Sequence, residues 1–562
     1  MSIKLADYLF TRLRQLGVDS AFGVPGDFNL RLLDFVEPSG LRWVGNCNEL
    51  NGAYAADGYA RIKGLSALIT TFGVGELSAI NGIAGAFTEK APVVHIVGTP
   101  PRPKQEARTF VHHTLGDGDY RHFANMATHV TVAQASLSDP RLVPDQIDWV
   151  LKQAIVHSRP VYLEVPDDMP DVLVEGGNLN NVIKLDFGRQ IESDTAALEQ
   201  VMERIYQAKQ PMIIVDGDTR AMGISTEAEA LVKLTNWPTW TTAFGRALIN
   251  EQLQNVYGIY TGQFGDPQWK EYHDTADLII ILGPHYSDTN TSIFTALPNP
   301  AVSVAFSPNT IQIGDIIHRD VSNKCLGHLV NSLDASRIAK VEGPSKSIIT
   351  EQALDPSGLI TQEHFWHKVN GLFQEGDLIL AETGTSSYGS QTFTVPKNAR
   401  LFNAVTWLSI GYMLPATLGA TLAQRDRTKD DTTRAFLFIG DGSLQMSVQE
   451  ISTMIREKLN VVIFVINNGG YTIERAIHGR TQKYNDVANW RHTQAMGFFG
   501  ADENHSMNNN FVARTWSDLE WILENENIQK GSGVRLVEVF MERDDVRGIL
   551  LQLMKTRIAN GD

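Results

Sequence analysis

AFLFIGDGS at residues 435–443 and VVIFVINNGG at residues 461–470 are two apolar runs, each followed at once by a polar, glycine-containing segment. Short apolar runs of this kind predict buried parallel strands, here Ala435–Ile439 and Val461–Ile466. Glycines at a strand-to-helix turn let backbone N–H groups approach a phosphate, and the N-terminus of the next helix, expected near Val448, favours its negative charge. Gly-Asp-Gly by itself is often only a tight turn, so the two segments together are a far more specific signal than either one.

Hard oxygen donors for a divalent metal occur in both segments. A carboxylate, an amide oxygen and a backbone carbonyl, joined by two diphosphate oxygens and a water, would complete the octahedron that Mg2+ prefers. The pair of segments resembles the cofactor motif of the thiamine diphosphate enzymes. The resemblance implies that Asp441, Asn468 and the carbonyl of Gly470 bind Mg2+. It also implies that thiamine diphosphate is bound in this part of the chain by Gly442, Ser443, Asn468, Gly470 and Tyr471.

An acidic residue in the N-terminal part matches a second position of these enzymes. In the family, a carboxylate hydrogen-bonded to the pyrimidine ring of the cofactor promotes the tautomer that removes the C2 proton of the thiazolium ring. Glu49 follows the expected strand Arg42–Gly45 and matches that position. Alternatively, Glu49 is an ordinary acidic residue near a helix N-terminus, where a negative charge is favourable. The resemblance also implies that Val74 contacts the cofactor.

The family bends its cofactor over an apolar wedge, and WLSIG at residues 407–411 resembles the wedge segment. By this resemblance Ile410 lies under the cofactor, and the carbonyl of Leu408 accepts a hydrogen bond from the pyrimidine amino group. Many members have glycine where Leu408 stands, which leaves the backbone conformation there open. AETGT at residues 381–385 resembles the segment whose threonine, here Thr385, touches the diphosphate.

Four further segments narrow the resemblance to the pyruvate and indolepyruvate decarboxylases. They are FGVPGD at 22–27, VHHTLG at 111–116, GYTIE at 470–474 and IHG at 477–479. The likeness runs through essentially the whole chain. It implies non-oxidative decarboxylation of a small 2-keto acid to an aldehyde and CO2 through a thiamine diphosphate enamine.

Groups that titrate near neutrality suit the proton transfers of such a reaction. Asp27, His113 and Glu474 are the expected proton relay, with His112 in support. Because neighbouring residues on a strand point to opposite faces, two histidines on one strand could not both face the site, and one of them would only be a scaffold.

The substrate pocket is expected to be formed by Thr383, Ser387, Ile473 and Ile477, together with the C-terminal helix. Ile473 and Ile477 share one helix face if a helix begins at Thr472. Their β-branched side chains resemble the small pyruvate-type pocket, whereas Ser387 stands where some pyruvate-specific members have a bulky aromatic residue. We therefore expect pyruvate to be accepted. Branched-chain or aromatic 2-keto acids (phenylpyruvate, indolepyruvate) are further candidate substrates if Ser387 lines the pocket. If Ser387 lies outside the pocket, it says nothing about them.

Apolar runs alternate with helical patterns along the chain, which predicts α/β domains with parallel sheets. We expect a pyrimidine-binding domain at 1–180, a middle domain at 190–342 and a diphosphate- and metal-binding domain at 358–562. Segments without periodicity at 167–186 and 342–359 are expected to be linkers. In the family, the glutamate and the metal motif of one site come from different subunits. The resemblance therefore implies a homo-oligomer, a dimer at least and usually a tetramer.

The composition excludes several kinds of partner. With 48 Lys and Arg against 64 Asp and Glu, the net charge is −16, and no basic block occurs, so we expect no nucleic-acid partner and no anionic membrane partner. No apolar run approaches the roughly 20 residues of a membrane span, and the first residues do not resemble a signal peptide. Two cysteines, Cys47 and Cys325, are typical of a cytoplasmic protein with reduced thiols.

Two other functions stay open at this point. A carboligase of the acetolactate synthase type would usually lack the paired histidines and carry FAD. An inactive regulatory paralogue would usually have lost a catalytic group, whereas all the groups named above are present. Some pyruvate decarboxylases use a middle-domain cysteine in substrate activation. The corresponding stretch VDGDTR at 215–220 has none, so activation through a cysteine is not expected.

Overall fold

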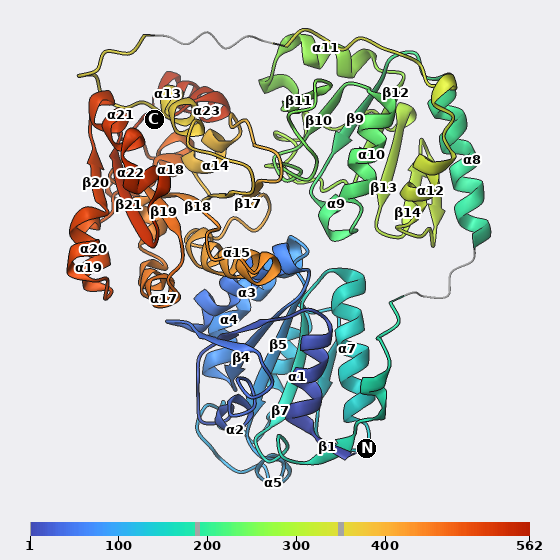
Figure 1. The fold of residues 1–562 in the computed structure, drawn as a ribbon, viewed down its shortest axis with the longest axis vertical. Helices are drawn as coiled ribbons and strands as arrows, with labels where there is room; N and C mark the ends of the chain where they lie inside the picture. Colours follow the sequence, from blue (N-terminus) through green and yellow to red (C-terminus); the bar gives the residue numbers. More distant parts are fainter. Residues whose placement is uncertain (1, 186–190, 347–352, 562) are drawn as a thin grey trace.

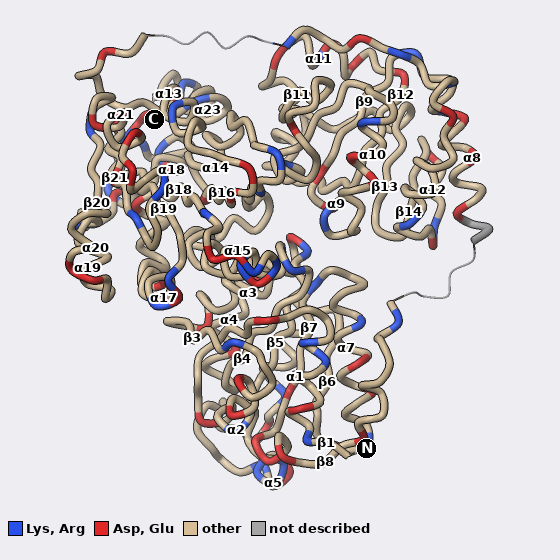
Figure 2. Tube along the Cα trace, viewed as in Figure 1, with Lys and Arg blue, Asp and Glu red and all other residues tan. Residues whose placement is uncertain are grey.

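The computed structural model describes residues 2–185, 191–346 and 353–561. Figure 1 shows three α/β domains, with the N-terminal one at the bottom in blue, the middle one at the upper right in green and the C-terminal one at the upper left in orange and red. The fold class expected from the sequence, α/β with three domains built on parallel sheets, is confirmed, and the sheets of the three domains are mostly parallel. Residues of both charge signs occur along the trace of all three domains (Figure 2).

The N-terminal domain has a six-stranded parallel sheet in the order β3-β2-β4-β5-β7-β6. Its strands are β2 Ser20–Gly23, β3 Arg42–Gly45, β4 Ser66–Thr71, β5 Val93–Thr99, β6 Gln134–Ser136 and β7 Val161–Pro166. Helices α1 and α7 cover one face of the sheet, and α3 and α4 cover the other. These four helices are α1 Leu5–Gln15, α3 Glu49–Lys63, α4 Val74–Thr88 and α7 Val143–His157.

The segment 167–186 was expected to be a linker, but part of it is ordered against the first domain. Strand β8 (Leu173–Glu175) pairs antiparallel with β1 (Ser2–Lys4). Residue 186 of this segment lies outside the described residues, as do residues 347–352 of the second expected linker, 342–359.

The middle domain has a seven-stranded sheet in the order β11-β10-β9-β12-β13-β14-β15. Its strands are β9 Pro211–Val215, β10 Thr239–Thr241, β11 Val256–Ile259, β12 Leu278–Leu282, β13 Ser303–Ser307, β14 Thr310–Ile313 and β15 Ile316–Arg319. Its longer helices are α8 Ile191–Gln207, α10 Ser225–Thr235, α11 Pro267–Thr275 and α12 Cys325–Ser332.

This middle sheet is not wholly parallel, contrary to the expectation for it, because β14 and β15 run antiparallel at its edge. Only two residues separate β13 from β14, and a connection that short can join only antiparallel neighbours. Asn309, at the turn, has φ of 61°, a left-handed conformation that asparagine tolerates.

The C-terminal domain has a six-stranded parallel sheet in the order β17-β16-β18-β19-β21-β20. Its strands are β16 Leu378–Ala381, β17 Arg400–Asn403, β18 Ala435–Gly440, β19 Val461–Asn467, β20 Asn510–Ala513 and β21 Val534–Phe540. Helix α15 covers one face, and α13 and α21 cover the other. The helices used below are α13 Gln362–Asn370, α14 Thr385–Ser390, α15 Met413–Thr428, α16 Asp441–Leu444, α17 Ile451–Arg456, α18 Thr472–Ile477, α21 Trp516–Glu524 and α23 Gly548–Ala559.

A helix was expected to begin near Val448, and a 3-10 helix at Val448–Glu450 does begin there and leads into α17. A short helix that was not expected, α16, precedes it and begins at Asp441. The last helix begins at Gly548, four residues after the expected start at Asp544.

Helices α3 and α15 join the N-terminal and C-terminal domains through a very close contact. A Cβ atom added at Gly419 would lie 1.8 Å from the carbonyl oxygen of Ala55, and one at Gly58 would lie 2.2 Å from that of Ala416. Only glycine allows the two backbones to approach this closely. The contact fixes the position of α3, and therefore of Glu49 at its start.

Candidate active site

The two glycine-containing segments lie side by side at one edge of the C-terminal sheet. Strands β18 and β19 are neighbours and run parallel, with Gly440 opposite Ile466. Because parallel strands end at the same edge, Asp441 and Asn468 leave the sheet next to each other. The strands themselves are held by a buried aromatic layer in which Phe438 stacks on Phe464 at 5.0 Å between ring centroids.

These segments have the chemistry of a cation site. The carboxylate of Asp441 is 2 % exposed, and burial raises its pKa to about 6. The side-chain oxygen of Asn468 is buried and has no hydrogen-bond partner among the described residues. A buried carboxylate beside an unsatisfied amide oxygen is costly unless something compensates both, and a hard divalent cation does so. The residues present therefore fit Mg2+.

Arg475 holds the segment after β19 in place, and it was not identified from the sequence. Its buried guanidinium donates to the carbonyl oxygens of Asn468 at 3.2 Å and Gly469 at 2.8 Å, and to the carboxylate of Asp486 at 2.8 Å. A second network from β21 reaches the same segment: Glu538 accepts hydrogen bonds from Asn467 at 2.7 Å and pairs with His492 at 2.8 Å. Which partners Arg475 and Glu538 reach depends on how the chain folds back on itself. No local sequence pattern therefore identifies these contacts.

The expected diphosphate residues form a cradle at the start of α16. A Cβ atom at Gly442 would lie 2.5 Å from the ring of Tyr471, so only glycine allows that ring to pack here. Ser443 is buried beside it. Gly470 has φ of 140°, and a Cβ atom there would meet the carbonyl oxygen of Asn485 at 2.1 Å, so the turn between β19 and α18 also requires glycine.

The segment 407–411, expected to be the wedge, contains a backbone conformation that glycine adopts more easily than leucine. Leu408 has φ of 54°, which is left-handed and uncommon for leucine. Hydrogen bonds on both sides hold it: Trp407 donates to Asn81 at 2.9 Å, and Ser409 pairs with the hydroxyl of Tyr54 at 2.6 Å. Ile410, two residues on, is half-buried.

Glu382 ties the wedge to the segment that contains Thr383 and Thr385, and it was not identified from the sequence. It is fully buried, and its carboxylate accepts backbone hydrogen bonds from Thr383 at 2.8 Å and Met413 at 2.9 Å. Burial raises its pKa to about 7. Thr385 begins α14, and the buried hydroxyl of Thr383 has no partner among the described residues.

Three of the four expected pocket residues lie near one another. Ile473 is the closest side chain to a Cβ atom built on Gly384, at 3.7 Å, and it packs with α23 in a cluster that includes Leu550 and Met554. Ser387 is on the first turns of α14, and its N–H donates to the carbonyl of Glu382 at 3.0 Å. Ile477 is exposed at the end of α18, as is Glu474 on the same helix.

Glu49 lies beside the start of α4. Its carboxylate oxygen would be 3.1 Å from a Cβ atom on Gly75, which places it next to Val74. Burial raises the pKa of the Glu49 carboxyl. Val74 itself is 54 % exposed, an unusual position for an apolar helix start.

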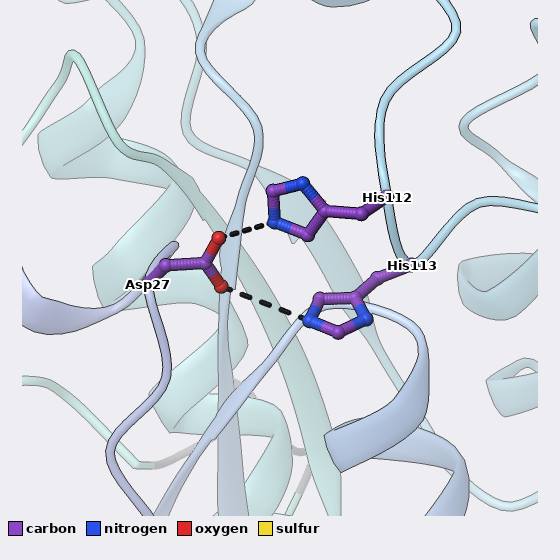
Figure 3. A group of neighbouring side chains, drawn as sticks. All are labelled: Asp27, His112 and His113. Atoms are coloured by element: carbon purple, nitrogen blue, oxygen red, sulfur yellow. Dashed lines mark hydrogen bonds and ion pairs between the residues drawn. The ribbon is translucent and has the colours of Figure 1, made fainter.

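Asp27, His112 and His113 converge in the N-terminal domain (Figure 3). One carboxylate oxygen of Asp27 pairs with Nε2 of His112, and the other lies 3.8 Å from Nε2 of His113. Phe28 stacks on His112, with ring centroids 4.9 Å apart. The three residues are partly or largely exposed, so the carboxylate and both imidazoles are available to a substrate.

The expectation that strand geometry would separate the two histidines is wrong. They lie in a turn, not a strand, and His113 has φ of 65°. This left-handed residue reverses the chain and turns both rings toward Asp27. Gly73 makes room for the turn, because a Cβ atom there would lie 2.2 Å from the carbonyl oxygen of His113.

Among the described residues of one chain, the site residues of the N-terminal domain make no direct polar contact with those of the C-terminal domain. Among the described residues, no hydrogen bond or ion pair joins Glu49, Asp27 or the two histidines to Asp441 or Asn468. The segment before Glu49 instead contacts the C-terminal domain at Glu450, whose carboxylate accepts from Asn46 at 2.8 Å and Asn51 at 2.9 Å.

This fold and this pair of segments define a thiamine pyrophosphate enzyme. The chain matches the N-terminal thiamine pyrophosphate binding domain at residues 3–123, the central domain at 198–331 and the C-terminal binding domain at 382–515. It is 51 % identical to a pyruvate decarboxylase of Aspergillus parasiticus over 99 % of this chain and 98 % of that protein. The chain belongs to the pyruvate decarboxylase family of thiamine diphosphate-dependent decarboxylases.

More distant relatives agree. Pyruvate decarboxylase of Candida glabrata is 40 % identical, with 98 % of each chain covered, and pyruvate decarboxylase isozyme 1 of Saccharomyces cerevisiae is 38 % identical, with 99 % of each covered. Among solved structures, benzoylformate decarboxylase of Polynucleobacter necessarius aligns with a TM-score of 0.79 at 19 % identity, over 97 % of this chain and 99 % of that one. At that identity the last similarity shows the fold alone.

Proposed function

We propose that this enzyme converts pyruvate to acetaldehyde and CO2 without oxidation. The observation that carries the proposal is the likeness to pyruvate decarboxylases along the full chain, at up to 51 % identity in the relatives named above. The acidic, histidine-lined turn at Asp27 and the cation-binding segments at Asp441 and Asn468 support it, because the reaction needs both proton transfer and a bound diphosphate.

Magnesium and thiamine diphosphate would be held by the C-terminal domain. Asp441, Asn468 and the carbonyl of Gly470 would bind Mg2+, and Gly442, Ser443, Tyr471 and Thr385 would surround the diphosphate. When bound, thiamine diphosphate supplies the nucleophilic carbon and accepts the electrons released with CO2. Leu408 and Ile410 would set its bent shape, while Val74 and Glu49 would contact its pyrimidine ring. The raised pKa of Glu49 suits a carboxyl that shares a proton with a ring nitrogen.

The proton transfers to and from the substrate would fall to Asp27, His112, His113 and Glu474. The shared contact with Asp27 orients both imidazoles toward one carboxylate. Phe28 limits the rotation of His112 by stacking on it. Both histidines would take part in proton transfer, His113 in the relay and His112 in support of it.

Substrate choice would be set by Thr383, Ser387, Ile473 and Ile477. Ile473 is braced by α23, so its side chain forms a fixed apolar wall. Ser387 is small, and this supports acceptance of longer aliphatic and aromatic 2-keto acids beside pyruvate. Discrimination by a few methylenes in an apolar pocket amounts to only about 1–3 kcal/mol, which fits a mixed profile.

A complete site would require a second copy of the chain. The lack of a polar contact between Glu49 and Asp441 among the described residues of one chain supports this, as do the exposed apolar side chains of Val74, Trp407 and Ile477. We propose that the chain forms at least a homodimer, and a homotetramer as is usual in its family.

The proposed domain limits are 1–180, 190–342 and 358–562. The proposed location is cytoplasmic, which the two unpaired cysteines support. Among the described residues no helix is both long and apolar enough to cross a bilayer.

The test is product analysis with purified enzyme, Mg2+ and thiamine diphosphate. We expect acetaldehyde and CO2 from pyruvate in equal amounts, with little acetolactate. Glu49→Gln should abolish most of this activity, whereas the control Glu37→Gln, at an exposed site of the same domain, should not. Acetolactate as the main product, or a flavin spectrum, would favour the carboligase, and no turnover of any 2-keto acid would favour the regulatory paralogue.

A further inference from the structure

A cleft of about 510 Å³ lies between the middle and C-terminal domains, apart from all the residues discussed so far. From the middle domain it is bordered by the first turns of α10 and by residues 247–250, and from the C-terminal domain by residues 395–400 and Arg427. Figure 1 shows why these segments meet: β17 is the edge strand on the side of the middle domain. A volume of this size is typical of sites for small metabolites.

The cleft is basic, although the chain as a whole carries a net charge of −16. Glu229 is the one carboxylate among the residues that line the cleft. Four cationic side chains also border it: Lys233, Lys397, Arg400 and Arg427. Glu229 already accepts hydrogen bonds from Lys233 and from the backbone N–H of Asn250, the latter at 2.9 Å. It can therefore offset about one of the four positive charges.

Arg400 and Arg427 are the uncompensated pair. Among the residues that the structure describes, neither has a hydrogen bond or an ion pair to a carboxylate. Arg400 is largely withdrawn from solvent, and its burial together with the charge of Arg427 lowers the pKa of the guanidinium. Two like charges that interact in this way, one of them partly buried, are unfavourable for folding, and a bound anion would offset that cost.

The cleft also offers an apolar wall. Leu248, Ile249, Val395 and Ala399 border it beside the arginines, and Ile249, Val395 and Ala399 are buried. Guanidinium groups bind phosphate through paired N–H donors, and an apolar wall suits the carbon part of an esterified phosphate. The combination distinguishes this cleft from a merely basic surface.

This cleft is remote from the cofactor segments. Arg400 is the first residue of β17, which runs parallel to β16 and β18. It therefore lies at the amino edge of the sheet, whereas Asp441 and Asn468 leave from the carboxyl edge. Arg427 is in the last turn of α15, a 16-residue helix of about 24 Å whose first residue follows the wedge segment. The diphosphate of the cofactor cannot reach these arginines from its own site.

We propose that the cleft between α10 and β17 is a second binding site, for a small molecule that carries a phosphate group. Arg400 and Arg427 bind the phosphate, with Lys397 beside them, and the apolar wall contacts any organic part. Because the lining residues come from two domains, the ligand joins the middle domain to the C-terminal domain.

The test is calorimetric titration of the holoenzyme, with thiamine diphosphate and Mg2+ saturating so that the cofactor site is filled. The probes are inorganic phosphate, adenosine monophosphate and adenosine. We expect the two phosphate-bearing probes to bind and adenosine not to bind. Tighter binding of the monophosphate than of phosphate indicates an esterified ligand, and equal binding indicates free phosphate; both outcomes support the site.

The variants assign the binding to the cleft. Arg427→Gln and Arg400→Gln should each weaken binding at least about tenfold, or by about 1.4 kcal/mol. Arg427 is exposed, so its replacement keeps the test valid if Arg400→Gln does not fold. Arg141→Gln, which removes an exposed arginine of the N-terminal domain, is the control. The proposal is overturned if neither phosphate nor the monophosphate binds, if both arginine variants bind like the wild type, or if the control loses binding equally.

Discussion

Replacement of Glu382 by glutamine should change the pH dependence of stability in a defined direction. The carboxyl is fully buried between the wedge and the segment of Thr383 and Thr385, and no cation is among the causes that shift its pKa. Burial raises that pKa from 4.5 to about 7, against the opposing effect of backbone hydrogen bonds from Met413 and Thr383. Glutamine has the same size and does not titrate, so it isolates the effect of the charge.

The magnitude follows from the two pKa values. At about 1.4 kcal/mol per pH unit, a carboxyl whose pKa rises from 4.5 to about 7 on folding changes stability by about 3 kcal/mol. The folded chain binds this proton more tightly than the unfolded chain. The stability it contributes is therefore fully present below pH 4.5 and is lost as the pH rises to about 7. Relative to Glu382→Gln, the wild type should lose about 3 kcal/mol across that interval.

The assay is thermal unfolding of both proteins at equal concentration and equal cofactor, from about pH 5 to about pH 8. For a unit the size of the C-terminal domain, about 3 kcal/mol corresponds to roughly 6–12 °C in the difference between the two midpoints. Other buried carboxyls such as Glu76 titrate in both proteins and cancel in that difference. Glu503→Gln, at an exposed position of the same domain, is the control. A midpoint difference that stays constant with pH would refute the reasoning.

Four further outcomes test the site. Asp441→Ala should lose bound cofactor while circular dichroism stays unchanged, because an anionic metal ligand is removed; normal activity at ordinary cofactor concentrations would contradict this. Glu49→Gln should bind cofactor but exchange its C2 proton far more slowly in deuterated water, as measured by NMR against Glu37→Gln. Arg475→Met should weaken Mg2+ activation about tenfold, since the carbonyls after β19 lose their donors, and an unchanged Mg2+ titration would exclude that role. Ser387→Trp should lower kcat/KM for phenylpyruvate and indolepyruvate more than for pyruvate; equal losses would mean that Ser387 does not shape the pocket.

Much of the fold could be predicted from local patterns. The apolar runs at 435–439 and 461–466 are strands because side chains buried on both faces must be apolar along their whole length. Helix α3 begins at Glu49, where it was expected, because the side chain of Asn48 caps it by accepting from the N–H of Asn51 at 2.8 Å. The fold class and the family could likewise be derived from segments whose chemistry is contained within a few residues.

Other features depended on contacts between distant parts of the chain. The turn of His112 and His113 needs Gly73 behind it, and the left-handed Leu408 is held by Tyr54 and Asn81 from the N-terminal domain. Arg475 carries no local signal, because its function comes from which carbonyls it reaches.

Glu382 and the cleft at Arg400 depend on the tertiary structure in the same way. Burial turns an ordinary carboxyl into one whose pKa is about 7, and the meeting of two domains turns scattered basic residues into a cluster. A sequence determines which groups are available and which segments form helices and strands. Electrostatics and hydrogen bonding depend on distance and solvent exclusion, and only the folded chain sets those.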